Sequence, residues 1–205
     1  MGLLLDMLYR IPALIIAVVL HEYVKATASW RLGDNQPKLN GRITLNPMKH
    51  IDLFGAICIL FTGFGWGRPV FTSPMFYGNR KKATIVVYAL PSIVNLVVGM
   101  IAAVLAHFVG LITFMPYIAQ NIVNGLIFQI AFVNIAMALF NIIPIYPLDG
   151  ARVLAVFLNP QARVKIASYE KAMQIFLILF ILIGFAQIIF GPLVYSIIGF
   201  VEGLQ

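Results

Sequence analysis

Residues 20–26 read LHEYVKA and place three ionisable side chains inside an apolar segment. His21 and Lys25 are four residues apart, so a helix would carry them on one face, with Glu22 about 100° round from His21. With a histidine at position 25 the stretch would read H-E-x-x-H, in which two histidines bind zinc beside a proton-accepting glutamate. Ionisable groups within a membrane span are costly and therefore predict a functional site. The alternative is a hydrated helix end at the membrane interface.

A second polar cluster follows another apolar segment, in the stretch NIIPIYPLDGAR, residues 141–152. Pro144 and Pro147 interrupt a helix, and Asp149 and Gly150 come directly after them. A broken helix beside a carboxylate is one way in which membrane proteins build an ion or metal site. The same residues also suit an ordinary turn. The depth of the carboxylate relative to the first cluster decides between these interpretations.

Composition predicts an all-α polytopic membrane protein, with residues 1–205 forming a single membrane-embedded domain. Of the 205 residues, 61% are hydrophobic and 10% are charged, and the mean hydropathy is +0.97. Soluble domains average roughly 45–50% apolar and about 25% charged residues. The net charge of +7 is interpreted as basic residues that orient the chain in the membrane and attract anionic lipid headgroups. Nothing in the sequence suggests nucleic-acid binding.

Apolar runs mark the expected membrane segments. Four transmembrane helices are expected at about residues 11–30, 83–110, 117–143 and 172–190. A shorter run, residues 53–67, contains four glycines and is expected to form a re-entrant hairpin. Its alternative is a further crossing.

Basic residues orient these segments. They cluster after the first span, after the short run and before the last span: Arg31, Lys38, Arg42, Lys49, Arg68, Arg80, Lys81, Lys82, Arg152, Arg163, Lys165 and Lys171. The connection 111–116 has no charge, so it and the N-terminus are expected outside and the basic segments in the cytoplasm. Both flanks of 53–67 then lie on one side, which favours re-entry. His21, Glu22 and Asp149 would lie at a similar depth and could converge on one ion.

The stretch GRITLNPMKHID, residues 41–52, predicts a short β-strand near the membrane, because RITLN alternates. Its edge could pair with an extended peptide. His50 is expected to be a hydrogen-bonding residue, with metal ligation as the alternative. Asn95 and Asn141 could form interhelical hydrogen bonds, or they could hold a substrate carbonyl or oxyanion.

Four stretches together carry a family resemblance. HEYVK, GRITLNPMKHIDLFG, ALPSIVN and NIIPIYPLDGARV, in this order over roughly residues 10–155, resemble the site-2 proteases, which are intramembrane zinc metalloproteases. The resemblance is closest to the small bacterial members without PDZ or CBS domains. It implies that the partners are the lipid bilayer and a membrane protein that is cleaved within or near its transmembrane segment. The expected location is a bacterial plasma membrane, with the active site toward the cytoplasm.

The resemblance also implies residue roles. One zinc ion would be held at the positions of His21, Lys25 and Asp149, and Glu22 would be the general base. Asn95 matches the asparagine of the third-helix motif. The glycine that is common in that motif is replaced by Leu90.

Lys25 is the important departure from the family, because a charged lysine has no lone pair for zinc. In one arrangement zinc binds His21, Asp149 and a substitute, which is either neutral Lys25 or His50. In a second, zinc binds weakly through two protein ligands and water. In a third there is no metal, and Lys25 pairs with Glu22 and Asp149. The corresponding functions are an intramembrane metalloprotease and a metal-free pseudoprotease that binds or regulates membrane proteins. An ion or proton pathway is a further alternative.

Overall fold

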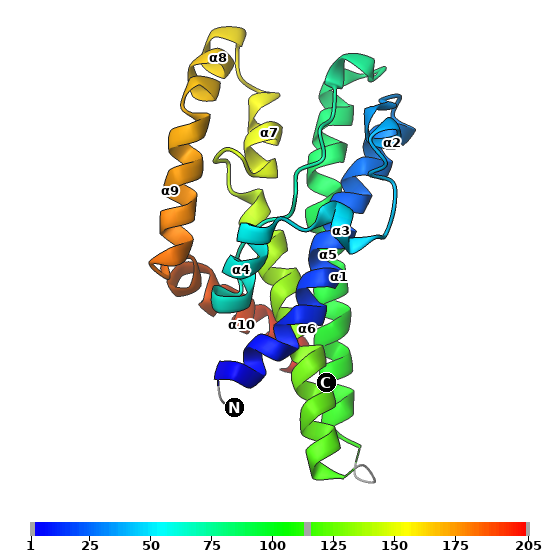
Figure 1. Ribbon diagram of the computed structural model, residues 1–205, viewed down its shortest axis with the longest axis vertical. Coiled ribbons are helices and arrows are strands. Elements are labelled where there is room, and N and C mark those ends of the chain that lie inside the picture. Colours follow the sequence, from blue (N-terminus) through cyan, green and yellow to red (C-terminus); the bar gives the residue numbers. More distant parts are fainter. Residues whose placement is uncertain (1–2, 113–115, 204–205) are drawn as a thin grey trace.

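The computed structural model describes residues 3–112 and 116–203, and all regular elements in these ranges are helices (Figure 1). In chain order they are α1 (Leu3–Arg31), α2 (Gln36–Leu39), α3 (Pro47–His50), α4 (Leu53–Thr62), the 3-10 helix η1 (Pro74–Phe76), α5 (Arg80–Gly110), α6 (Tyr117–Ile142), α7 (Asp149–Ala155), α8 (Pro160–Ser168), α9 (Glu170–Leu182) and α10 (Phe185–Gly203). Residues 113–115, within the uncharged connection that was expected outside the membrane, lie beyond the described ranges.

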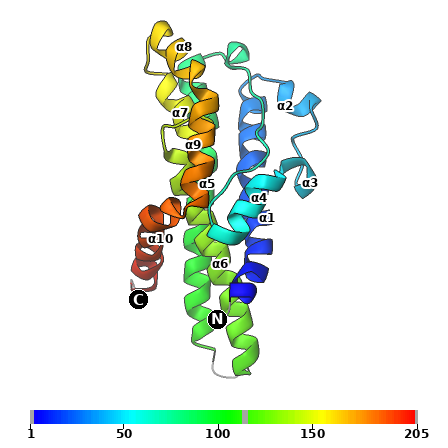
Figure 2. The same ribbon diagram turned by 60° about the vertical axis from the view of Figure 1, so that its left-hand side comes forward.

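Three described helices are long and apolar enough to cross a membrane, namely α1, α5 and α6. The pair α9 and α10 qualifies as a fourth candidate span, bent by 68° (Figures 1 and 2). The expectation of an all-helical polytopic membrane protein with about four spans is confirmed. The bend lies at Gly184, where the φ of +86° suits glycine, and α10 continues past residue 190, where the last span was expected to end. Pro192 is accommodated within α10.

The chain between α1 and α5 begins and ends at the same end of the molecule, the upper end in Figure 1. Within it, α4 is a short apolar helix, after which the chain returns to the start of α5. This path agrees with re-entry. Arg10 of α1 holds the end of α4, because Nη1 donates to the carbonyl oxygens of Leu60 at 3.0 Å and Phe61 at 3.1 Å. The last carbonyls of a helix lack partners within it, and inside a membrane they must find them in the protein.

The expected β-strand within residues 41–52 is absent from the described structure, where 42–46 are irregular and α3 follows. An isolated antiparallel bridge joins Ile51 to Gly67. A single strand is not stable without neighbouring strands to complete its hydrogen bonds. Asn46 instead caps α3, accepting a hydrogen bond from the backbone N–H of Met48 at 3.0 Å.

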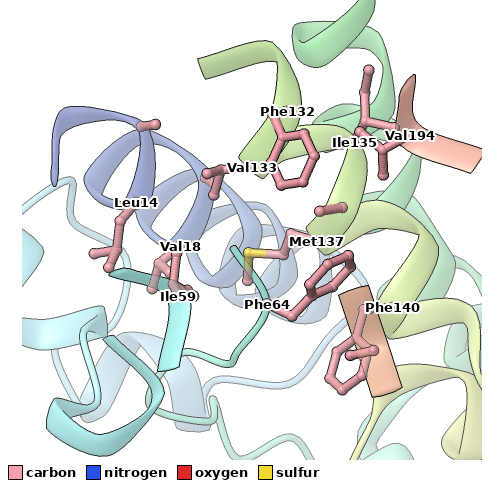
Figure 3. Close-up of a cluster of buried hydrophobic side chains, with 14 of the residues drawn as sticks. Leu14, Val18, Ile59, Phe64, Phe132, Val133, Ile135, Met137, Phe140 and Val194 are labelled. Carbon is pink, nitrogen blue, oxygen red and sulfur yellow. The ribbon is translucent and has the colours of Figure 1, made fainter. Parts of the chain in front are cut away.

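The hydrophobic core joins the candidate spans to residues 53–67 (Figure 3). Its side chains point toward one another from α1, α4, the chain after α4, α6 and α10: Leu14, Val18, Ile59, Phe64, Phe132, Val133, Ile135, Met137, Phe140 and Val194. Gly63, with a φ of +81°, turns the chain at the end of α4, so that the following aromatic ring enters the core. Phe64 then packs 6.2 Å from the rings of Phe132 and Phe140. This core fixes α1 and α6 relative to each other.

Candidate functional site

The two polar clusters of the sequence meet where α7 begins beside the C-terminal half of α1. The α6 helix ends at Ile142, the chain turns through its prolines, and α7 starts at Asp149. His21 Nε2 lies 2.9 Å from Asp149 Oδ2, and the side chains are 1% and 5% exposed. The topology argument placed these groups at one depth, and the structure brings them into contact.

Lys25 lies between the two carboxylates of this cluster. Its Nζ is 2.8 Å from Asp149 Oδ1 and 3.3 Å from Glu22 Oε1. All three side chains are at most 6% exposed. The ring centroid of Tyr88 lies 5.8 Å from the same amine, on the face of α5. Opposite charges attract strongly in such a protected site, and this attraction acts against the cost of removing each charge from water.

The second oxygen of Glu22 is held by backbone. The N–H of Val70 donates to Glu22 Oε2 at 3.0 Å. This depends on close packing at Gly67, where an added Cβ would lie 2.7 Å from Val18 Cγ1 and 3.2 Å from Glu22 Cγ. Glycine at position 67 therefore lets the returning chain approach α1 and reach the carboxylate.

His50 is buried, and its Nε2 donates to the backbone carbonyl of Thr44 at 2.6 Å. Burial lowers the pKa of His50, and the hydrogen bond to Thr44 opposes that shift only in part. The imidazole is therefore neutral near pH 7, with Nε2 committed to the loop. The expected hydrogen-bonding role is thus observed, whereas a role as substitute ligand stays a prediction.

The two candidate asparagines lie on different helices. Asn95 of α5 donates from Nδ2 to the carbonyl of Ala17 at 3.1 Å, and so ties α5 to α1 one turn before His21. Asn141 donates to the carbonyl of Met137 on its own helix at 3.0 Å. It also lines a cavity of about 180 Å³ together with Ser92 of α5 and Gly150 of α7. Their part in holding a substrate stays a prediction.

Comparison with known proteins places the chain in a family. The family described as Peptidase family M50 matches residues 2–184. The chain belongs to this family, the site-2 proteases. The protein named "Putative zinc metalloprotease YwhC" of Bacillus subtilis strain 168 is 34% identical over 177 residues, which are 84% of this chain and 80% of that protein.

More distant relatives include the protein named "Putative zinc metalloprotease Rip2" of Mycobacterium tuberculosis strain H37Rv. It is 28% identical over 174 residues, which are 82% of this chain and 64% of that protein. The protein of the same name from Mycolicibacterium smegmatis is 27% identical over 163 residues, which are 77% of this chain and 60% of that protein. The match thus spans slightly less than two thirds of both Rip2 chains. No solved structure matches this chain.

The donor set of this M50 member does not fit the zinc that its relatives' names imply. Among the described residues, no three His, Cys, Asp or Glu side chains form a group that could hold a metal ion. Lys25 stands where the family resemblance implies a histidine ligand, and its ammonium among two carboxylates has no lone pair to give. In addition, zinc on His21 Nε2 would require a proton on Nδ1, and that buried atom has no partner in the described structure. Metal-binding histidines almost always donate this second N–H to an acceptor.

Sequence reasoning missed two contacts of the M50 site. Tyr88 carried no signal beyond its place in an apolar helix, yet its ring faces Lys25. The backbone N–H of Val70 cannot be recognised from residue type at all. The glycine-rich end of the run 53–67 was the one signal for this backbone contact, because a glycine there indicates that the chain approaches another element closely.

Proposed function

We propose that this M50 chain binds membrane-spanning segments of other membrane proteins without cleaving them. The observation that carries the proposal is the position of the Lys25 amine, 2.8 Å from Asp149 Oδ1 and 3.3 Å from Glu22 Oε1. A fixed ammonium thus stands among the groups that other family members are expected to present to a metal. Family membership supports the membrane-protein partner, and the lysine supports the loss of metal chemistry.

The hydrogen bonding of the carboxylates supports the same proposal. Asp149 is engaged through both oxygens, by Lys25 and by His21. Glu22 is likewise engaged through both oxygens, by Lys25 and by the N–H of Val70. A buried carboxylate is stable when it is paired and hydrogen-bonded, and here the protein supplies every partner. The cluster holds the start of α7 against α1 without needing an ion.

A zinc peptidase is the second candidate function. It is favoured by the retention of His21, Glu22 and Asp149 in one buried cluster and by the relatives named zinc metalloproteases. In that case His21 and Asp149 would hold the ion with a deprotonated Lys25 or with His50, and Glu22 would be the general base. The substrate would be a membrane protein cut within or near its transmembrane segment.

Metal analysis separates these candidates. The wild-type chain and Lys25→His are purified in detergent with zinc present, and bound metal is counted per chain. We expect essentially none in the wild type and about one zinc ion in Lys25→His, because the variant restores three family ligands. Lys82→His, which places a histidine on an exposed lysine position, is the matched control and should resemble the wild type. One zinc per wild-type chain, lost in His21→Ala, would overturn the proposal in favour of the peptidase.

We propose that the site end of the molecule faces the cytoplasm of a bacterial plasma membrane. The basic residues near the ends of α1, α5 and α7 support this orientation. Single cysteines at position 82 and at Tyr117, in a Cys58→Ser background, would be treated with a membrane-impermeant maleimide. In intact cells we expect labelling at position 117 alone. Labelling at position 82 alone would reverse the orientation.

A further inference from the structure

A basic cavity of about 430 Å³ lies where α5 begins, between the chain before η1, α7 and α8. Four cationic side chains line it, namely Arg80 and Lys81 of α5, Arg152 of α7 and Arg163 of α8. Its lining in the described structure contains no aspartate or glutamate. The positive-inside rule requires such charges on one side of the membrane, but it does not require them to converge on one cavity.

Two of these cations already have partners. Arg163 donates from Nε to the carbonyl of Leu158 at 2.9 Å and from Nη2 to that of Val156 at 3.2 Å. Arg152 Nη2 lies 3.6 Å from Glu170 Oε1, and its guanidinium lies 4.9 Å from the ring of Tyr146. These two arginines therefore help to build the wall of the cavity.

The other two cations are available. Arg80 and Lys81 are exposed, and their side chains make no hydrogen bond or ion pair with the described residues. They begin the segment of α5 that is long and apolar enough to cross a membrane. An anion that enters the cavity meets the unpaired charges of Arg80 and Lys81, and no carboxylate is among the described lining residues.

Apolar surface adjoins the basic cavity. Val164 lines the cavity and is 73% exposed, and Phe157, which follows the lining residue Val156 in the chain, is 72% exposed. Exposed apolar groups of this size beside cations at the end of a span suit a ligand with both a negative headgroup and hydrocarbon. A small soluble anion would use the charges and leave the apolar groups in water.

We propose that this cavity binds the phosphate group of an anionic phospholipid, with Arg80 and Lys81 as its principal contacts. Basic pockets between membrane helices bind anionic headgroups in this way, and arginine and lysine form charge-assisted hydrogen bonds with phosphate. A zwitterionic headgroup carries its own ammonium, which the four cations repel. The site does not depend on whether the chain cleaves or binds its protein partners. Its lining includes the hydrogen-bonded pair Tyr88 and Thr72, and the Tyr88 ring centroid lies 5.8 Å from Lys25 Nζ.

Lipid binding to the full-length chain tests the proposal. The purified protein is stripped of lipid in detergent and titrated with dioleoyl phosphatidylglycerol or dioleoyl phosphatidylcholine, and bound lipid is counted by native mass spectrometry. We expect tighter binding of phosphatidylglycerol, weakened about 25-fold in Arg80→Gln/Lys81→Gln, since each surface cation contributes about fivefold. The control Lys49→Gln/Lys82→Gln removes the same charge from exposed positions outside the lining and should bind like the wild type.

Three outcomes would overturn the proposal. The first is equal loss of phosphatidylglycerol in both double variants, which would mean attraction to net charge alone. The second is displacement of the lipid by inorganic phosphate at an equal or lower concentration, which would assign the cavity to a free phosphate. The third is displacement by a short polyglutamate peptide at a lower concentration than the lipid, which would assign it to an acidic protein segment. If the double variant does not fold, Arg80→Gln and Lys81→Gln are compared singly with Lys82→Gln.

Discussion

Lys25 and Asp149 form the shortest ion pair in the described structure, with Nζ and Oδ1 2.8 Å apart and side chains 6% and 5% exposed. The pair joins the first membrane helix to the short helix that follows the break after α6. It occupies the position at which the family resemblance expects a metal ligand. The Lys25 amine therefore affects both the stability of the fold and the capacity of the site to bind a metal ion.

Removing this amine should destabilise the protein. Lys25→Met leaves Glu22 and Asp149 buried without their shared cation, and breaking one side of a buried ion pair costs about 3–5 kcal/mol. Unfolding in detergent micelles, followed by circular dichroism, measures the loss. Lys82→Met on an exposed position should change stability by less than about 0.5 kcal/mol. Equal stability of the two variants would show that the Lys25 amine is not held between the carboxylates.

Neutralising the whole cluster should restore much of that loss. In Lys25→Met/Glu22→Gln/Asp149→Asn the amides keep hydrogen-bonding capacity, and no uncompensated charge remains inside the protein. Replacing a buried ionic group as a unit is often neutral or stabilising. We expect the triple variant to be at least 1 kcal/mol more stable than Lys25→Met, in line with couplings of about 0.5–3 kcal/mol between contacting residues. If the three losses simply add, the charges are not coupled and the lysine acts through packing.

The meeting of His21, Glu22 and Asp149 could be predicted because topology follows from charged loops. Counting lysines and arginines places the C-terminal half of α1 and the end of α6 at a similar depth without any knowledge of packing. The same reasoning predicts that residues 53–67 re-enter the membrane, and the chain around α4 returns to the end of the molecule from which it came.

Other features depend on tertiary contacts that residue patterns do not encode. The stretch RITLN alternates like a strand but has no neighbouring strand to pair with, so α3 forms beside an irregular segment. The bend in the last candidate span lies at Gly184, because glycine there adopts a positive φ, whereas Pro192 remains within α10. The hydrogen bond from Val70 to Glu22 depends on how closely Gly67 packs against α1.

Gly150 should be the glycine whose side-chain-free backbone positions Asp149. A Cβ there would collide with the carbonyl oxygen of Ile142 and lie 2.6 Å from that of Ile143. These are backbone atoms at the end of α6, so α7 would have to move away. We expect Gly150→Ala to cost about 1–3 kcal/mol in the free energy of unfolding, as overpacking usually does.

The matched control for that substitution is Gly78→Ala, because a Cβ at Gly78 meets no heavy atom within 4 Å. Both variants are unfolded under the same detergent conditions. A stability of Gly150→Ala equal to that of Gly78→Ala would contradict the close packing of α7 against the end of α6.

Acidification should destabilise the protein partly through His50. Burial lowers the pKa of His50 in the folded state, whereas the unfolded chain takes up a proton near pH 6.5. The unfolded state then binds more protons, so the stability that neutral His50 contributes is present above pH 6.5. It is lost as the pH falls from there toward the folded pKa, with a slope of at most about 1.4 kcal/mol per pH unit.

His50→Gln keeps a donor for the Thr44 carbonyl but does not titrate, so its unfolding free energy should fall less steeply between about pH 6.5 and 5. His107→Gln is the control for removing a histidine elsewhere in the chain. If the unfolding free energy of His50→Gln falls as steeply with pH as that of the wild type, protonation of His50 does not destabilise the protein.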